Sequence, residues 1–217
     1  PQQGYLIIPR LFAHKVDAIN TEIDRLTNDR TVDFNFTGKK IMDAWQYSAT
    51  LNEVFHEQKI LNILAFIFQK QPIPFQTINF MYGSEQKPHS DFIHMSTEPM
   101  GYLSAQWIAL EDIQENSGEL VYYPGSHKLN YVFSEDYATG NNALLIGEHN
   151  YDRYEEKIES IIQQHNLQPH YFHAKKGDVL IWHANLLHGG SPINNPLLTR
   201  KSMVAHYYAK DVLCYHE

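Results

Sequence analysis

The sequence changes its hydrophobic period once, near residue 75, and this change constrains the fold more than any other feature. Before it, residues 12–26 and 51–69 place apolar side chains at helical spacing, and the two prolines that follow stop the second helix. After it come short runs rich in β-branched and aromatic residues, separated by turn residues. These strand-like runs are residues 75–82, 102–110, 119–123, 171–174, 178–183 and 201–208. Several short strands preceded by helices predict a mainly β fold, a jelly-roll barrel whose outer face the helices cover.

Other segments complete the expected arrangement. Residues 5–8 form an apolar run closed by Pro9, which predicts an edge strand. Residues 28–45 show no clear period, which predicts a loop that covers a site. Residues 151–165 have helical spacing inside a long connection, and such insertions commonly act as lids or binding loops. For 217 residues we expect a single domain, with N-terminal helices at about 12–69 and a β core at about 75–208.

Charge and composition exclude several partner classes. The chain has 17 Lys plus Arg against 25 Asp plus Glu and no basic stripe, so we expect no nucleic-acid partner. The apolar stretch at residues 60–68 is much shorter than the roughly 20 residues that span a membrane, so we expect no membrane partner. Cys214 has no cysteine with which to pair, and no signal-like apolar run opens the sequence. These features predict a cytoplasmic location.

A metal site is indicated by His89-Ser90-Asp91, which follows a turn-rich stretch at residues 83–88. Residues two apart on a strand point to the same face, so His89 and Asp91 can approach one ion. Two imidazoles and one carboxylate leave open positions on a metal, which is the arrangement used for oxygen activation at Fe(II). The second imidazole is His183 or His188. We favour His188 because the adjacent Gly189 allows the backbone close to the metal.

Arg200 follows His188 at the head of the last strand-like run. Its planar guanidinium matches a carboxylate with two parallel hydrogen bonds, so an inward-facing arginine near such a metal suits the distal carboxylate of a dicarboxylic keto acid. The alternative is that Arg200 pairs with an internal acid.

Four ordered motifs between about residues 78 and 208 make the chain resemble the phytanoyl-CoA dioxygenase family, the branch of the 2-oxoglutarate oxygenases that includes ectoine hydroxylase. The motifs are His89-Ser90-Asp91-Phe92, Trp107-Ile108-Ala109-Leu110-Glu111-Asp112, Asn116-Ser117-Gly118-Glu119-Leu120 leading to Pro124-Gly125-Ser126-His127-Lys128, and Lys176-Gly177-Asp178 through His188-Gly189 to Arg200. The resemblance implies a double-stranded β-helix, Fe(II) held by His89, Asp91 and His188, and 2-oxoglutarate anchored by Arg200. It also implies co-substrate contacts from Asn79, Trp107 and Ser191.

The activity that this resemblance implies is hydroxylation of a small-molecule substrate with O2 and 2-oxoglutarate, releasing succinate and CO2. Halogenation is disfavoured because halogenating relatives have a small residue in place of Asp91. Desaturation, cyclisation or epimerisation by the same ligands stays open, as does a non-catalytic ligand-binding jelly roll. A zinc hydrolase has no need for the keto-acid arginine. The segments that would choose the substrate, residues 28–45, 92–101 and 129–150, hold few clustered Lys or Arg, which favours a small polar or sugar-like substrate over a CoA ester.

Overall fold

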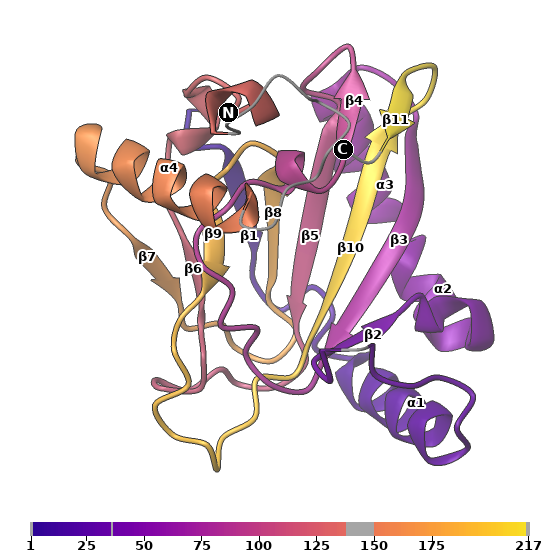
Figure 1. Cartoon of the computed structure of the whole chain (residues 1–217). Helices are drawn as coiled ribbons and strands as arrows, with labels where there is room; N and C mark the ends of the chain where they lie inside the picture. The colour runs from indigo at the N-terminus through magenta and orange to yellow at the C-terminus, as the bar shows by residue number, and fades with distance from the viewer. Residues whose placement is uncertain (1, 36, 138–149, 216–217) are drawn as a thin grey trace.

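The computed structural model describes residues 2–35, 37–137 and 150–215. Its largest element is a six-stranded antiparallel sheet with the strand order β1-β8-β5-β10-β3-β2 (Figure 1). These strands are β1 (Tyr5–Ile8), β2 (Lys40–Met42), β3 (Pro72–Phe80), β5 (Leu103–Ala109), β8 (Val179–His183) and β10 (Ser202–Ala209). A three-stranded sheet in the order β7-β6-β9 is built from β6 (Leu120–Tyr122), β7 (His170–Phe172) and β9 (His188–Gly190). A separate pair joins β4 (Ser96–Glu98) to β11 (Leu213–Tyr215).

Alternating side chains give the large sheet two buried faces. In β8, Val179 and Ile181 pack with the helices, whereas Leu180 and Trp182 pack against residues of the three-stranded sheet. The same alternation in β10 sends Met203 toward the helices and Val204 into the barrel. A strand covered on both sides is apolar at nearly every position, which explains why its sequence lacks a clean polar alternation.

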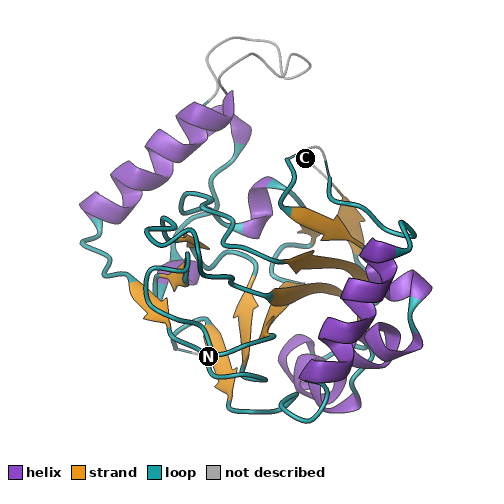
Figure 2. Cartoon of the chain, turned by 90° about the horizontal axis from the view of Figure 1, so that it is seen from below, coloured by secondary structure: helices purple, strands orange, loops and turns teal. Residues whose placement is uncertain are grey.

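Helices cover the outer faces of both sheets. The first three, α1 (Val16–Asn28), α2 (Ala49–Phe55) and α3 (Gln58–Phe68), lie on the large sheet, and α4 (Asn150–Gln164) lies beside the three-stranded sheet (Figures 1 and 2). Among the described residues, no helix combines the length and apolar character needed to cross a bilayer. The predicted jelly-roll arrangement, with helices on the outside, is therefore what the chain forms.

Several predicted boundaries need correction. The single helix expected at residues 51–69 is wrong: α2 ends at Phe55 and α3 starts at Gln58, where the Glu57 side chain accepts a hydrogen bond from the amide of Lys59. The expected loop at residues 28–45 contains β2 and leads into a 3-10 turn, Ala44–Tyr47. The predicted edge strand β1 and the helix α4 are confirmed. Residues 138–149 of the connection before α4 lie outside the described residues.

Candidate active site

Three side chains of metal-binding types, from two distant parts of the sequence, meet inside the barrel. His89, Asp91 and His188 are all buried, and one ligand atom of each lies within 4.8 Å of the others. The backbone fixes this meeting, because the amide of His89 donates to the carbonyl of His188 and the amide of His188 donates back, each at 2.9 Å. The amide of Asp91 donates to the carbonyl of Ala184 at 2.9 Å. The backbone thus ties the His89–Asp91 segment to His188 of β9 and to Ala184, just after β8.

Both histidines present the same ring nitrogen to the cluster. Nδ1 of His89 lies 2.9 Å from the carbonyl oxygen of Lys87, and Nδ1 of His188 lies 2.9 Å from that of Leu186. A carbonyl only accepts, so Nδ1 carries the hydrogen in each ring. In the neutral form of each ring, Nε2 then carries no hydrogen and is free to bind a metal.

Asp91 is held with one oxygen toward the histidines. Nε1 of Trp182 donates to Oδ2 of Asp91, while Oδ1 lies 3.5 Å from Nε2 of His188 and 3.9 Å from Nε2 of His206. Burial by itself raises the pKa of Asp91, but interactions with His188, His206 and His89 hold that pKa below its ordinary range. Burial also lowers the pKa of His89 well below its usual value. The cluster therefore pairs an ionised carboxylate with a neutral imidazole, the forms that coordinate metal ions.

A cavity of about 640 Å³ connects the cluster to Arg200. Arg200 is only 2% exposed, and its Nη1 donates to Oγ of Ser202 at 2.9 Å. Its guanidinium carbon lies 5.4 Å from the ring centre of Phe80 and 5.7 Å from that of Trp107. Burial lowers the pKa of Arg200 to about 10, a value still high enough to keep the group charged at neutral pH.

Arg200 has no salt bridge to an acid in the described part of the chain. The charges of Glu111 and Glu119 raise its pKa, but both carboxylates accept hydrogen bonds elsewhere: Glu111 from Thr199 and the amide of Lys201, and Glu119 from the amide of Asn116. The sequence-based alternative, an internal acid partner for Arg200, is therefore not what the described residues form.

Two residues that line this part of the cavity each carry a buried donor without a partner among the described residues. Nε of Arg200 and Nε1 of Trp107 make no hydrogen bond to any described residue. A buried donor without an acceptor is costly, so such groups commonly belong to a ligand site. An acidic ligand beside Arg200 and Trp107 would satisfy both.

Two of the expected co-substrate contacts lie elsewhere. Asn79 pairs with Met203 across β3 and β10, so its side chain points to the helix-covered face and does not line the cavity. Its neighbours Ile78 and Phe80 line the cavity instead, because side chains alternate along a strand. Ser191 is buried just beyond β9 and also lies outside the cavity wall. Of these three expected contacts, the structure brings only Trp107 to Arg200.

Several polar residues of the cavity were not among the predicted site residues. Lys40 reaches it from β2, and His206 and Gln76 are cross-strand neighbours that both line it. Burial lowers the pKa of Lys40, and its ammonium group has no salt bridge to a described acid. A strand of three residues gives almost no periodic signal, so the inward position of Lys40 could not be foreseen.

His183, the competing candidate for the third ligand, lies outside the cluster of His89, Asp91 and His188. Its Nδ1 accepts a hydrogen bond from the amide of Asn185, and its ring packs beside that of His127. It borders a different hollow, about 710 Å³ and mostly apolar, between α3 and the outer face of β1 and β8. That hollow contains none of the three clustered side chains.

Comparison with known proteins agrees with this geometry. The family model "Phytanoyl-CoA dioxygenase (PhyH)" matches residues 1–202. A curated relative, phytanoyl-CoA dioxygenase domain-containing protein 1 of Danio rerio, is 32% identical over 85 residues, which are 37% of this chain and 29% of that protein. The chain thus matches less than a third of that relative's length.

Solved structures share the fold at low sequence identity. The non-heme alpha ketoglutarate dependent carbocyclase SnoK from nogalamycin biosynthesis has a TM-score of 0.73 and 17% identity, over 97% of this chain and 81% of that one. EctD from S. alaskensis with 2-oxoglutarate and 5-hydroxyectoine has a TM-score of 0.70 and 16% identity, over 96% of this chain and 73% of that one. These likenesses confirm the predicted double-stranded β-helix. The family model matches most of this chain, and the chain therefore belongs to the phytanoyl-CoA dioxygenase family.

Proposed function

We propose that this protein is an Fe(II)- and 2-oxoglutarate-dependent oxygenase that hydroxylates a small-molecule substrate, with release of succinate and CO2. The observation that carries the proposal is one cavity that contains both the buried cluster of His89, Asp91 and His188 and an arginine without an acid partner among the described residues. Either feature alone fits many proteins. Their combination suits a metal and a dicarboxylic keto acid bound side by side.

The metal would be held by Nε2 of His89, Nε2 of His188 and Oδ1 of Asp91. The first two are the unprotonated nitrogens left by the Nδ1 contacts, and the third is the oxygen that Trp182 leaves free. When bound, iron and the keto acid would together activate O2, which is the oxidant for chemistry at a C–H bond. The protein contributes fixed ligands and a largely buried cavity.

The co-substrate would lie between Arg200 and the metal cluster. Arg200 would bind its distal carboxylate, with Nε1 of Trp107 as a further donor. Lys40 lines the same cavity and, like Arg200, has no described acid partner, so two cations are available to a dianion. Phe80 and Trp107 flank the guanidinium and would exclude water from that end.

The substrate would occupy the part of the cavity beyond the metal. Gln76, Gln86, His94 and His206 line it there, together with apolar side chains such as Met95. This mixture suits a small polar molecule that forms several hydrogen bonds. An outcome other than hydroxylation remains a second candidate, because the fold is shared with a protein described as a carbocyclase.

The deciding experiment is anaerobic addition of Fe(II) and then 2-oxoglutarate to the purified protein. We expect a visible metal-to-ligand charge-transfer band that depends on both additions and is lost in Asp91→Ala. A substrate screen scored by succinate release would follow. Absence of the band in a folded wild-type protein, or full coupled turnover by Asp91→Ala, would reject the proposal.

A further inference from the structure

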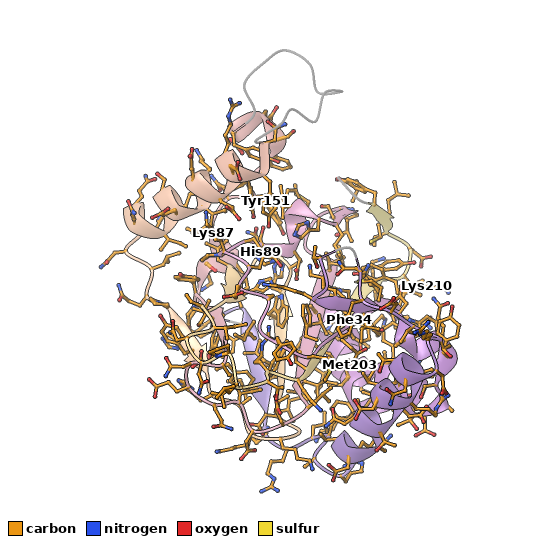
Figure 3. The ribbon with its side chains drawn as sticks, turned by 60° about the horizontal axis from the view of Figure 1, so that its bottom comes forward. Phe34, Lys87, His89, Tyr151, Met203 and Lys210 are labelled. Carbon is orange, nitrogen blue, oxygen red and sulfur yellow. The ribbon has the colours of Figure 1, made fainter. Side chains whose placement is uncertain are left out.

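Helix α4 contacts the segment that carries two of the proposed metal ligands. Tyr151, Tyr154 and Glu155 stand at positions i, i+3 and i+4 and so share one face of the helix. The Tyr151 hydroxyl accepts a hydrogen bond from Nε2 of Gln86 at 3.0 Å, and Glu155 forms a 2.9 Å salt bridge with Lys87. Figure 3 shows Tyr151 on the helix, with Lys87 and His89 on the segment next to it.

The third contact lies between the two ligands themselves. The amide of Ser90 donates to the hydroxyl of Tyr154 at 2.9 Å, and Oγ of Ser90 lies 3.4 Å from the same hydroxyl. Tyr154 is completely buried and Ser90 is 2% exposed. The neighbouring amides of His89 and Asp91 donate to backbone carbonyls, so only the central amide of this turn depends on a side chain.

Burial raises the pKa of Tyr154 to about 12, so its hydroxyl stays protonated and neutral. It accepts from the amide of Ser90 and still has a hydrogen to donate, for which Oγ of Ser90 is within reach. Removal of this hydroxyl would leave a buried amide without an acceptor. The turn would then shift to find one, and the two ligands would move with it.

We propose that Tyr154 is a positioning residue for the metal site, because its hydroxyl fixes the turn between His89 and Asp91. The inference rests on the proposed function for the metal itself. It adds that docking of α4 and metal binding stabilise each other. A metal ion that favours the ordered turn must also favour the docked helix, because the helix holds the turn in place. The insertion that carries α4 is then a support for the metal ligands.

The test is Tyr154→Phe, with Co(II) alone as the probe and its visible absorption as the readout. We expect the affinity for Co(II) to fall about 10-fold or more, as for other groups that hold metal ligands in place. Tyr123→Phe is the matched control, because it removes the hydroxyl of another buried tyrosine in the same apolar cluster without touching residues 86–91. It should bind Co(II) like the wild type. Thermal melting of both metal-free variants reports any general loss of stability.

A second measurement needs no variant. In the wild-type protein, Co(II) should slow hydrogen exchange in residues 150–158 as well as in residues 86–91. Equal Co(II) affinity of Tyr154→Phe and wild type, or protection confined to residues 86–91, would overturn this inference alone. A wild-type protein that bound no Co(II) would overturn the metal site and this inference together.

Discussion

Nε1 of Trp182 donates a 2.8 Å hydrogen bond to Oδ2 of Asp91, and both side chains are buried inside the barrel. This bond leaves Oδ1 to face the histidines. Trp182→Phe keeps an aromatic ring but removes the donor, so we expect metal affinity to fall about 10- to 100-fold. Trp45→Phe is the control, since it removes a similar indole contact, 3.3 Å to Asp43, far from the cluster. Titration with Co(II) measures both; equal affinities would contradict the role of Trp182.

Arg200→Met should separate binding of the keto acid from binding of the metal. The variant removes a buried charge that we assign to the distal carboxylate, and losing such a partner costs about 2–5 kcal/mol. We expect the dissociation constant for 2-oxoglutarate to rise about 100-fold or more while Co(II) affinity changes little. Arg25→Met, which removes an exposed arginine paired with Glu22, should change neither value. Unaltered 2-oxoglutarate binding by Arg200→Met would remove the arginine from the proposal.

His188→Ala and His183→Ala form a matched pair that tests the choice of ligand. Both remove an imidazole from the same stretch of chain, but only His188 lies in the cluster with His89 and Asp91. We therefore expect His188→Ala to lose measurable metal binding and His183→Ala to retain it. Metal content after dialysis, measured on both folded variants, decides the matter.

Burial and the neighbouring His127 lower the pKa of His183 to about 4, from an ordinary value near 6.5. Between these values the unfolded chain binds a proton that the folded chain does not, so stability falls as pH drops from about 6.5 to about 4. The loss should reach about 1–3 kcal/mol, because its size follows from the difference between the two pKa values. Protonation of Nδ1 would also break the hydrogen bond that this atom accepts from the amide of Asn185. Urea unfolding at several pH values should show a weaker dependence for His183→Gln. Parallel curves for the two proteins would argue against this assignment.

Gly177 and Gly125 share a φ of +85° but have different surroundings. A β-carbon on Gly177 would overlap the backbone of Ala13, whereas one on Gly125 would meet nothing within 4 Å. Gly125→Ala should therefore cost only the backbone term of about 1–2 kcal/mol. Gly177→Ala should cost about 1–3 kcal/mol more, because the turn before β8 and the segment before α1 would have to move apart. Chemical denaturation compares the two variants.

The sequence was most informative where residue type and turns agree. Runs of β-branched and aromatic residues bounded by turn residues located β5, β6, β8 and β10. The same approach missed β9, since His188-Gly189-Gly190 has no β-branched residue, although its pairing with β6 brings His188 to the cluster. Short strands are stabilised mainly by pairing with other strands, and a single sequence does not show which strands will pair.

Asn79 shows a different limit. Alternation correctly places it opposite Ile78 and Phe80, but both faces of β3 are buried, so the pattern does not say which face is the barrel interior. A change of one residue exchanges the two faces completely. The three residues of the candidate metal site were easier to select, because their combination of chemical types is rare and does not depend on register.

The paired backbone hydrogen bonds between His89 and His188 have a consequence for how the protein would acquire the proposed ion. Sheet pairing, which the polypeptide completes by itself, already brings these two residues together, so the metal-free protein should reach its native state unaided. The ion would then bind after folding is complete, and its binding would be reversible. A preformed set of two nitrogens and one oxygen admits several divalent ions, with copper and nickel intrinsically ahead of iron. The ion that occupies the site would depend on which divalent ions are available in the cell. A preparation purified on a nickel resin would carry nickel in place of iron.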